Sequence, residues 1–126
     1  MKKVLLPAML LMLAMGSVQA AQTKRTAAPP PYAAFWSEFK AAVIKGDSQK
    51  VASMTRFPFL FQNDEQNEAG FIKKFNVLFP ARVKSCFAKA KTVKERDGFE
   101  VFCGESIYLF EKVDGVYKFT EIGVND

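Results

Sequence analysis

The side chains that most often carry out chemistry in proteins are scarce in this chain of 126 residues. The chain contains no histidine, so the commonest general base near neutral pH is missing. A serine or cysteine nucleophile would therefore lack its usual partner. Gly98, Gly104 and Gly115 have the spacing of turn residues and not of a phosphate-binding loop. We expect the chain not to be an enzyme, and we predict no catalytic residue and no cofactor.

Carboxylates near the C-terminus are the remaining candidates for acid–base chemistry. They are Glu100, Glu105, Glu111 and Glu121. These residues occur in segments where polar and apolar residues alternate, as in strands with one exposed face. Glu100 and Phe102 would share one face, while Val101 and Cys103 would share the other. We therefore predict that these carboxylates are mostly exposed to solvent.

Cys86 and Cys103 are the only two cysteines, and their chemistry has three alternatives. They could form a disulfide, hold a metal ion or act as reactive thiols. The metal alternative lacks histidine ligands, and the redox alternative lacks the usual CxxC spacing. We predict a structural Cys86–Cys103 disulfide and no metal site.

The aromatic content is high, with thirteen phenylalanines, three tyrosines and one tryptophan. Such rings usually form the core, because each buries a large apolar area. Tyr32, Trp36 and Tyr108 also carry a polar group, which suits the rim of a pocket. We predict these three residues as candidate contacts for a small apolar or amphipathic ligand, with a plain core role as the alternative.

The N-terminus has the pattern of a secretory signal peptide over residues 1–20. Lys2 and Lys3 precede an apolar run, and small residues precede the expected cleavage after Ala20. The run is too short for a stable membrane anchor, so we predict a periplasmic or secreted protein. Residues 21–31 are expected to be a flexible proline-rich leader. One domain would then occupy residues 32–126.

The domain is expected to begin with two helices. Phe35, Phe39 and Val43 recur every four residues, which predicts an amphipathic helix over residues 32–45. Gly46 is a typical helix stop, and Asp47 can cap a second short helix that ends near Met54.

An aromatic strand and further helices should follow. Phe57, Phe59 and Phe61 alternate, and Pro58 restricts their segment to a sheet edge or a strand beginning. Residues 62–67 are polar and are expected to form a surface loop. Asn67 can cap a helix over residues 68–79, and Pro80 would end it or start a short turn through Phe87.

Two Asp-Gly pairs in the last third predict two hairpins. Asp97-Gly98 separates residues 92–96 from 99–103, and Asp114-Gly115 separates residues 106–112 from 116–122. The fold class is therefore α+β, with N-terminal helices packed on a curved antiparallel sheet.

The stretch FWSEFKAAVIKGDSQKVASMTRFPF, together with this element order, resembles small exported members of the nuclear transport factor two-like superfamily, which has the cystatin-like cone fold. The resemblance covers residues 32–122 and implies a curved sheet around helices with a conical pocket. Enzymatic members of this group use a pocket histidine, or an aspartate base facing a tyrosine or protonated acid. No positions here match those motifs, so no catalytic residues carry over.

Charge is unevenly distributed along a chain whose formal net charge is +5. Basic residues dominate positions 73–96, and acidic residues dominate from Asp97 onward. This split predicts two oppositely charged faces, or simply a solvated surface.

We expect a non-catalytic binding protein with a small apolar or amphipathic ligand in a conical pocket. The alternative is a periplasmic protein-binding module, such as an inhibitor or an immunity-type partner, because the charge split could steer an oppositely charged protein. We expect no nucleic-acid partner for an exported chain, and a homodimer stays open.

Overall fold

A computed structural model describes residues 31–125 of the chain. The predicted signal peptide, and all of the predicted leader except Pro31, lie outside the described residues. The helices are α2 (Tyr32–Lys45), α3 (Ser48–Ser53), α4 (Glu68–Lys73), α5 (Phe75–Leu78) and α6 (Ala81–Lys89). The strands are β1 (Phe59–Phe61), β2 (Asp64–Gln66), β3 (Val93–Glu95), β4 (Gly98–Cys103), β5 (Ser106–Val113) and β6 (Val116–Val124).

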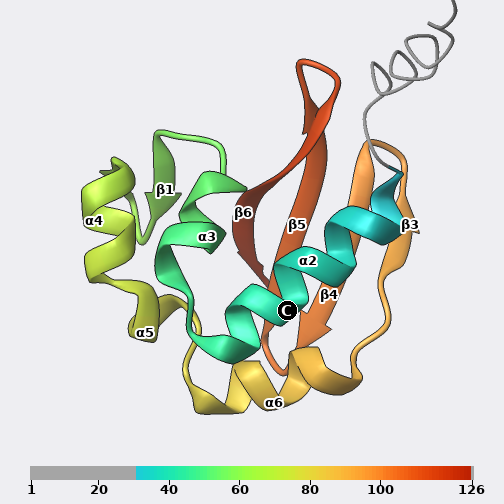
Figure 1. Ribbon diagram of the computed structural model, residues 1–126, viewed down its shortest axis with the longest axis horizontal. Coiled ribbons are helices and arrows are strands. Elements are labelled where there is room, and N and C mark those ends of the chain that lie inside the picture. Colours follow the sequence, from blue (N-terminus) through green and yellow to red (C-terminus); the bar gives the residue numbers. More distant parts are fainter. Residues whose placement is uncertain (1–30, 126) are drawn as a thin grey trace, which may run out of the picture.

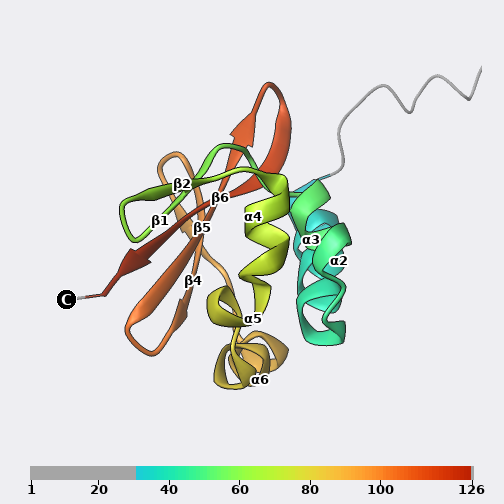
Figure 2. The same cartoon turned by 90° about the vertical axis from the view of Figure 1, so that its left-hand side faces the viewer.

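The last four strands form one antiparallel meander in the order β3-β4-β5-β6. In Figure 1, α2 crosses in front of this sheet and α6 runs along its lower end. Figure 2 shows α2 and α3 at one side of the molecule and the end of β6 at the other. The chain is therefore an α+β protein with helices packed on an antiparallel sheet, as predicted.

Local capping residues fix the corner between α2 and α3. Gly46 adopts a left-handed conformation with φ 79°, which glycine tolerates without steric cost. The carboxylate of Asp47 then accepts a hydrogen bond from the Lys50 backbone N–H at 3.2 Å, as an N-cap does. Both predicted caps and the predicted bounds of the first helix are confirmed.

The segment after Pro58 differs from the prediction, because residues 62–67 are not simply a loop. Asp64–Gln66 forms β2, which pairs antiparallel with β1 in a separate two-stranded sheet. Gln62 and Asn63 make the connecting turn with φ values of 53° and 68°. Two consecutive left-handed residues are characteristic of a type I′ hairpin turn. The polar composition of residues 62–67 gave no sign of this hairpin in the sequence. As predicted, Pro58 lies just before a strand begins.

The predicted helix over residues 68–79 is divided in two. Asn67 caps α4 by accepting the Gly70 backbone N–H at 2.8 Å, as expected. The chain leaves regular helix at Lys74, whose φ and ψ are −95° and 11°, before α5 begins. Pro80 does begin another helix, α6, which extends two residues beyond the predicted end at Phe87.

The first hairpin of the meander is displaced by one residue from the prediction. Glu95 pairs with Gly98, so Arg96 and Asp97 form the turn and Gly98 belongs to β4. The second hairpin turns at Asp114-Gly115, as predicted, and both residues have positive φ.

The edge strand β6 is joined to the helical half of the chain. A parallel bridge links Thr55 to Phe119. The Phe119 backbone N–H donates to the Met54 carbonyl at 2.9 Å, and the Arg56 N–H donates to the Phe119 carbonyl at 3.0 Å. An irregularity in the pairing of β5 with β6 lies at Leu109/Phe110, where such bulges increase local twist.

The core lies between the sheet and α2. The Phe39 ring is fully buried and contacts Phe110 and Phe119 at centroid distances of 5.0 and 5.3 Å. Phe59 of β1 is also fully buried and lies 4.9 Å from Phe119. Aromatic contacts therefore join α2 and β1 to the sheet.

Candidate functional site

The three aromatic residues predicted to contact a ligand all lie in the packed interior. Tyr32, Trp36 and Tyr108 have exposed fractions of 8%, 9% and 2%. Tyr32 stacks on Phe99 at 3.6 Å between ring centroids, and Trp36 lies 5.2 Å from Phe87. None of the three lines the two surface cavities described below. Their role in binding a ligand stays a prediction, and their observed role is in the core.

The hydroxyl groups of the two tyrosines differ in their hydrogen bonding. Tyr108 donates a hydrogen bond to the Leu78 carbonyl at 2.8 Å and so ties β5 to α5. Burial raises the pKa of Tyr108 to about 12, although Arg82 opposes this shift. Burial also raises the pKa of Tyr32, with partial compensation from Thr92. Within residues 31–125, the Tyr32 hydroxyl forms no hydrogen bond of normal geometry. Both hydroxyls therefore stay protonated at neutral pH.

The predicted disulfide is present between Cys86 and Cys103, with Cα atoms 5.8 Å apart. It connects α6 to the end of β4, so it fixes the helix that packs beneath the sheet. Within residues 31–125, no three side chains of the His, Cys, Asp or Glu types gather closely enough to hold a metal ion. None of the described helices is long and apolar enough to cross a membrane.

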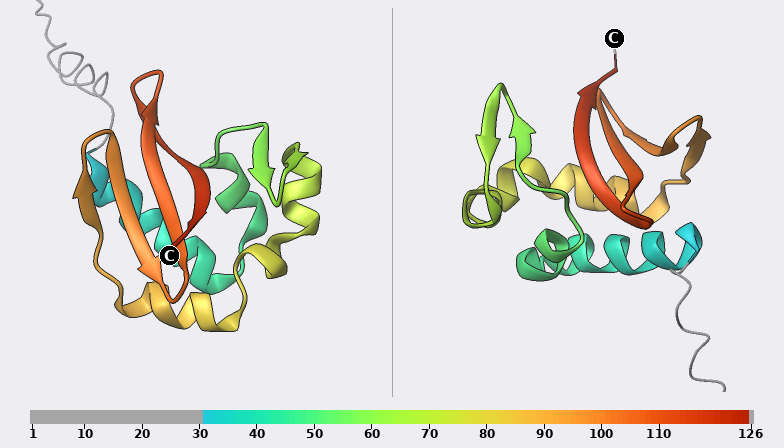
Figure 3. Two further views of the ribbon diagram at one scale, coloured as in Figure 1. Left: turned by 180° about the vertical axis from the view of Figure 1, so that it is seen from behind. Right: turned by 90° about the horizontal axis from the view of Figure 1, so that it is seen from above.

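The face of the four-stranded sheet that points away from α2 combines exposed apolar and acidic side chains. Seen from behind in Figure 3, the sheet lies in front of α2, and no described element covers it. Val101 and Cys103 of β4 point into the core, whereas the Phe102 side chain between them is 41% exposed. The predicted alternation along β4 is thus confirmed.

Strand register shows which side chains share this exposed face with Phe102. Phe102 is opposite Ile107, which is opposite Gly123. In the next row, Glu100 lies between Val93 and Leu109, and Leu109 is opposite Glu121. Glu95, Gly98 and Glu111 form a further row, which Lys118 of β6 completes. We call this face the outer sheet surface. Its apolar members are Val93, Phe102, Ile107 and Leu109, and its acidic members are Glu95, Glu100, Glu111 and Glu121.

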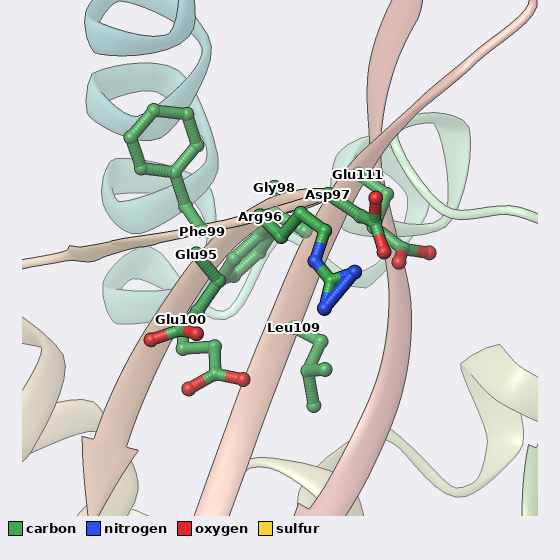
Figure 4. Close-up of a pocket in the computed structure, with 9 residues that line it drawn as sticks. Glu95, Arg96, Asp97, Gly98, Phe99, Glu100, Leu109 and Glu111 are labelled. Atoms are coloured by element: carbon green, nitrogen blue, oxygen red, sulfur yellow. The ribbon is translucent and has the colours of Figure 1, made fainter.

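A cavity of about 370 Å³ opens at the β3–β4 end of the outer sheet surface. Figure 4 shows the carboxylates of Glu95 and Glu100 side by side, with those of Asp97 and Glu111 on the other side of Arg96. The Phe99 ring turns away toward α2. Desolvation, followed by repulsion from Glu95, raises the pKa of Glu100. Glu95 and Glu100 are therefore close enough to repel each other, although desolvation is the larger cause of the shift.

The helical side of the molecule has the opposite character. Lys73 ends α4, and Arg82, Lys84 and Lys89 lie on α6. The Lys84 ammonium lies 5.6 Å from the Phe75 ring centroid, so its charge stays beside the helices. The basic residues of α4 and α6 therefore lie apart from the acidic outer sheet surface, but Arg96 of the same basic segment lies among the carboxylates of its cavity, so the predicted separation into two faces is incomplete.

The sequence assigned Phe102 to the same face as Glu100 but did not single it out as a functional residue. The available signal was a large aromatic residue on the polar side of an alternating strand.

Comparison with known proteins identifies no family for this chain. Neither the models of known families, nor the curated proteins, nor the solved structures include a match to it. The resemblance to the nuclear transport factor two-like superfamily therefore stays a prediction.

Proposed function

We propose that this chain is an exported, non-catalytic protein-binding module whose partner docks on the outer sheet surface. The observation that carries this proposal is the exposed Phe102 ring near the end of β4 on an uncovered sheet face, with Glu100 two residues before it on the same face. Aromatic side chains are enriched among the residues that contribute most to protein interfaces. Export is supported by the disulfide, which is typical of oxidising compartments.

The charge of the outer sheet surface selects the chemistry of the partner. Glu100 and Glu121 lie on either side of Leu109, and Glu95 and Glu111 extend the acidic rim. Such a surface attracts a basic protein over long range and disfavours an acidic one. The partner would therefore present an apolar side chain to Phe102 and lysine or arginine residues to the rim.

The same rim argues against a second copy of this chain at this surface. A two-fold dimer brings the same patch of both subunits together. Glutamates of the two copies would then lie close together, and like charges across an interface are unfavourable. A basic partner of a different sequence satisfies both the apolar centre and the acidic rim.

Capture from envelope extract tests this proposal when the bait is varied at the surface itself. The unmodified domain should retain a basic protein at low salt and release it at high salt, because screening weakens charge attraction. Phe102→Ala should weaken retention, and the pair Glu100→Lys with Glu121→Lys should abolish it.

A matched control separates this surface from overall charge. Glu65→Lys with Glu68→Lys changes the net charge by the same amount, but these residues lie in β2 and α4. This control should retain the partner nearly as well as the unmodified domain. Equal loss in both charge variants, or retention that does not depend on Phe102, would show that the outer sheet surface is not the binding site.

A further inference from the structure

A second, smaller cavity lies at the β6 edge of the sheet, between α2 and the end of α3. Its volume is about 200 Å³. Phe35 and Ala34 of α2, Met54 after α3, and Tyr117 of β6 form its walls. Of the rows of the outer sheet surface named above, only Lys118, at the β6 edge, also lines this cavity, so its occupant is treated separately from the protein partner.

The walls of this cavity select an apolar group. Phe35 and Met54 have exposed fractions of 6% and 9%, so they present fixed, largely buried surfaces to the cavity. Typical sites for drug-sized ligands have volumes of roughly 300–1,000 Å³. The smaller volume here suits one aromatic ring or one branched aliphatic chain.

The charged groups at the cavity favour an anion. Lys118 lines it and donates one hydrogen bond to the Ser53 carbonyl at 3.3 Å, which leaves other ammonium donors free. Glu38 also lines it, but the Glu38 carboxylate lies 3.6 Å from the Lys50 ammonium, which balances its charge.

Lys118 forms no close ion pair with its neighbours in the described part of the chain. Glu111 is opposite Lys118 in the strand register, but within residues 31–125 no carboxylate lies within 4 Å of the Lys118 ammonium. The cavity therefore combines apolar walls with one ammonium group that forms no ion pair within 4 Å among the described residues.

We propose that this cavity binds a small apolar carboxylic acid. The apolar group lies against Phe35, Met54 and Tyr117, and the carboxylate pairs with the Lys118 ammonium. This chemistry places the small-ligand role, which the sequence assigned to Tyr32, Trp36 and Tyr108, at different residues.

Three matched probes test the proposal by calorimetric titration of the disulfide-bonded domain. They are phenylacetate, its neutral analogue phenylacetamide, and the cation 2-phenylethylamine. Phenylacetate should bind about tenfold more tightly than phenylacetamide, because a charge-assisted hydrogen bond replaces a neutral one. The amine should bind least. Equal affinity for the three probes, or no detectable binding of phenylacetate, would overturn the proposal.

Variants locate the binding within the molecule. Lys118→Met keeps an apolar stem but removes the charge, so it should abolish the preference for phenylacetate. Lys112→Met is the control, because Lys112 lies over the Tyr117 ring at 5.5 Å but does not line the cavity. A preference that survives Lys118→Met, or one that is lost equally in Lys112→Met, would contradict the assignment.

A steric variant tests the apolar part of the site. Ala34 is exposed on α2, and leucine is nearly as good a helix former as alanine. Ala34→Leu should fill the cavity and weaken binding of phenylacetate and phenylacetamide together, while the thermal unfolding temperature stays unchanged. Undiminished binding of both probes would show that they bind elsewhere.

Discussion

At the scale of single residues, Gly98 occupies a position where the packing of the sheet leaves no room for a side chain. A Cβ atom on Gly98 would lie 2.0 Å from the Phe110 carbonyl oxygen, which is far inside contact distance. The sequence places Gly98 next to Asp97, so the pair was interpreted as a turn. The structure assigns this glycine to β4, where close approach of β5 requires it. Only tertiary contact distinguishes the two explanations.

Gly98→Ala should therefore destabilise the domain by about 1–3 kcal/mol, because the neighbouring backbone must move to admit the methyl group. Urea unfolding measures the change. Gly123→Ala is a matched control in the same sheet, since its Cβ would meet the nearest atom, from Leu109, at an ordinary 3.7 Å. Similar unfolding midpoints for the two variants would contradict this account.

At the scale of elements, the sequence predicts well what is determined locally. Gly46, Asp47 and Asn67 define the ends of α2, α3 and α4 through contacts within a few residues. The break at Lys74 was missed, because the buried positions Phe71, Phe75 and Leu78 continue the same apolar pattern through it. The β1–β2 hairpin was missed for the opposite reason, since its second strand, Asp64–Gln66, has no apolar alternation to reveal it.

The β1–β2 turn has a sequence that does not match its geometry, which leads to a prediction. Gln62 and Asn63 both have positive φ, whereas Asn-Gly is the preferred pair for this turn. Gln62→Asn with Asn63→Gly should stabilise the domain by up to about 1 kcal/mol, by relieving left-handed strain.

The turn of the β5–β6 hairpin is the control for this experiment. Asp114 already precedes Gly115 there, with φ 54°, and Asp-Gly is already well suited to the turn. Asp114→Asn should leave the urea unfolding midpoint almost unchanged. If the Asn-Gly variant of residues 62–63 loses stability, the hairpin geometry is not the limiting feature.

At the scale of the whole molecule, the candidate binding surface depends on which sheet face the helices leave bare. Strand alternation placed Phe102 with Glu100, but the opposite face of a sheet is often covered in α+β proteins. Whether a face is covered depends on where distant helices pack, and the alternation of residues along a strand does not reveal where they pack. The surroundings of the three predicted ligand contacts depend on distant packing in the same way. Tyr32, Trp36 and Tyr108 have the composition of a pocket rim, yet their neighbours fill the space around them.

The Cys86–Cys103 bridge acts at this same scale, because it joins the helical half to the sheet. Replacing both cysteines with serine should lower the free energy of unfolding by about 3 kcal/mol, as expected for a closed loop of this length. Urea unfolding of the variant and of the reduced native protein should agree. Unchanged midpoints in both would show that the bridge contributes little.

Trp36 is the only tryptophan in the chain, and its position has a practical consequence. Its indole contacts Phe87 of α6 and Phe110 of β5 at centroid distances of 5.2 and 5.6 Å. One intrinsic fluorophore therefore sits where three elements meet, shielded from water while they are assembled. Its emission maximum should shift to longer wavelength when any of these elements separates. Fluorescence can therefore follow the packing of α2, α6 and β5 without an added label.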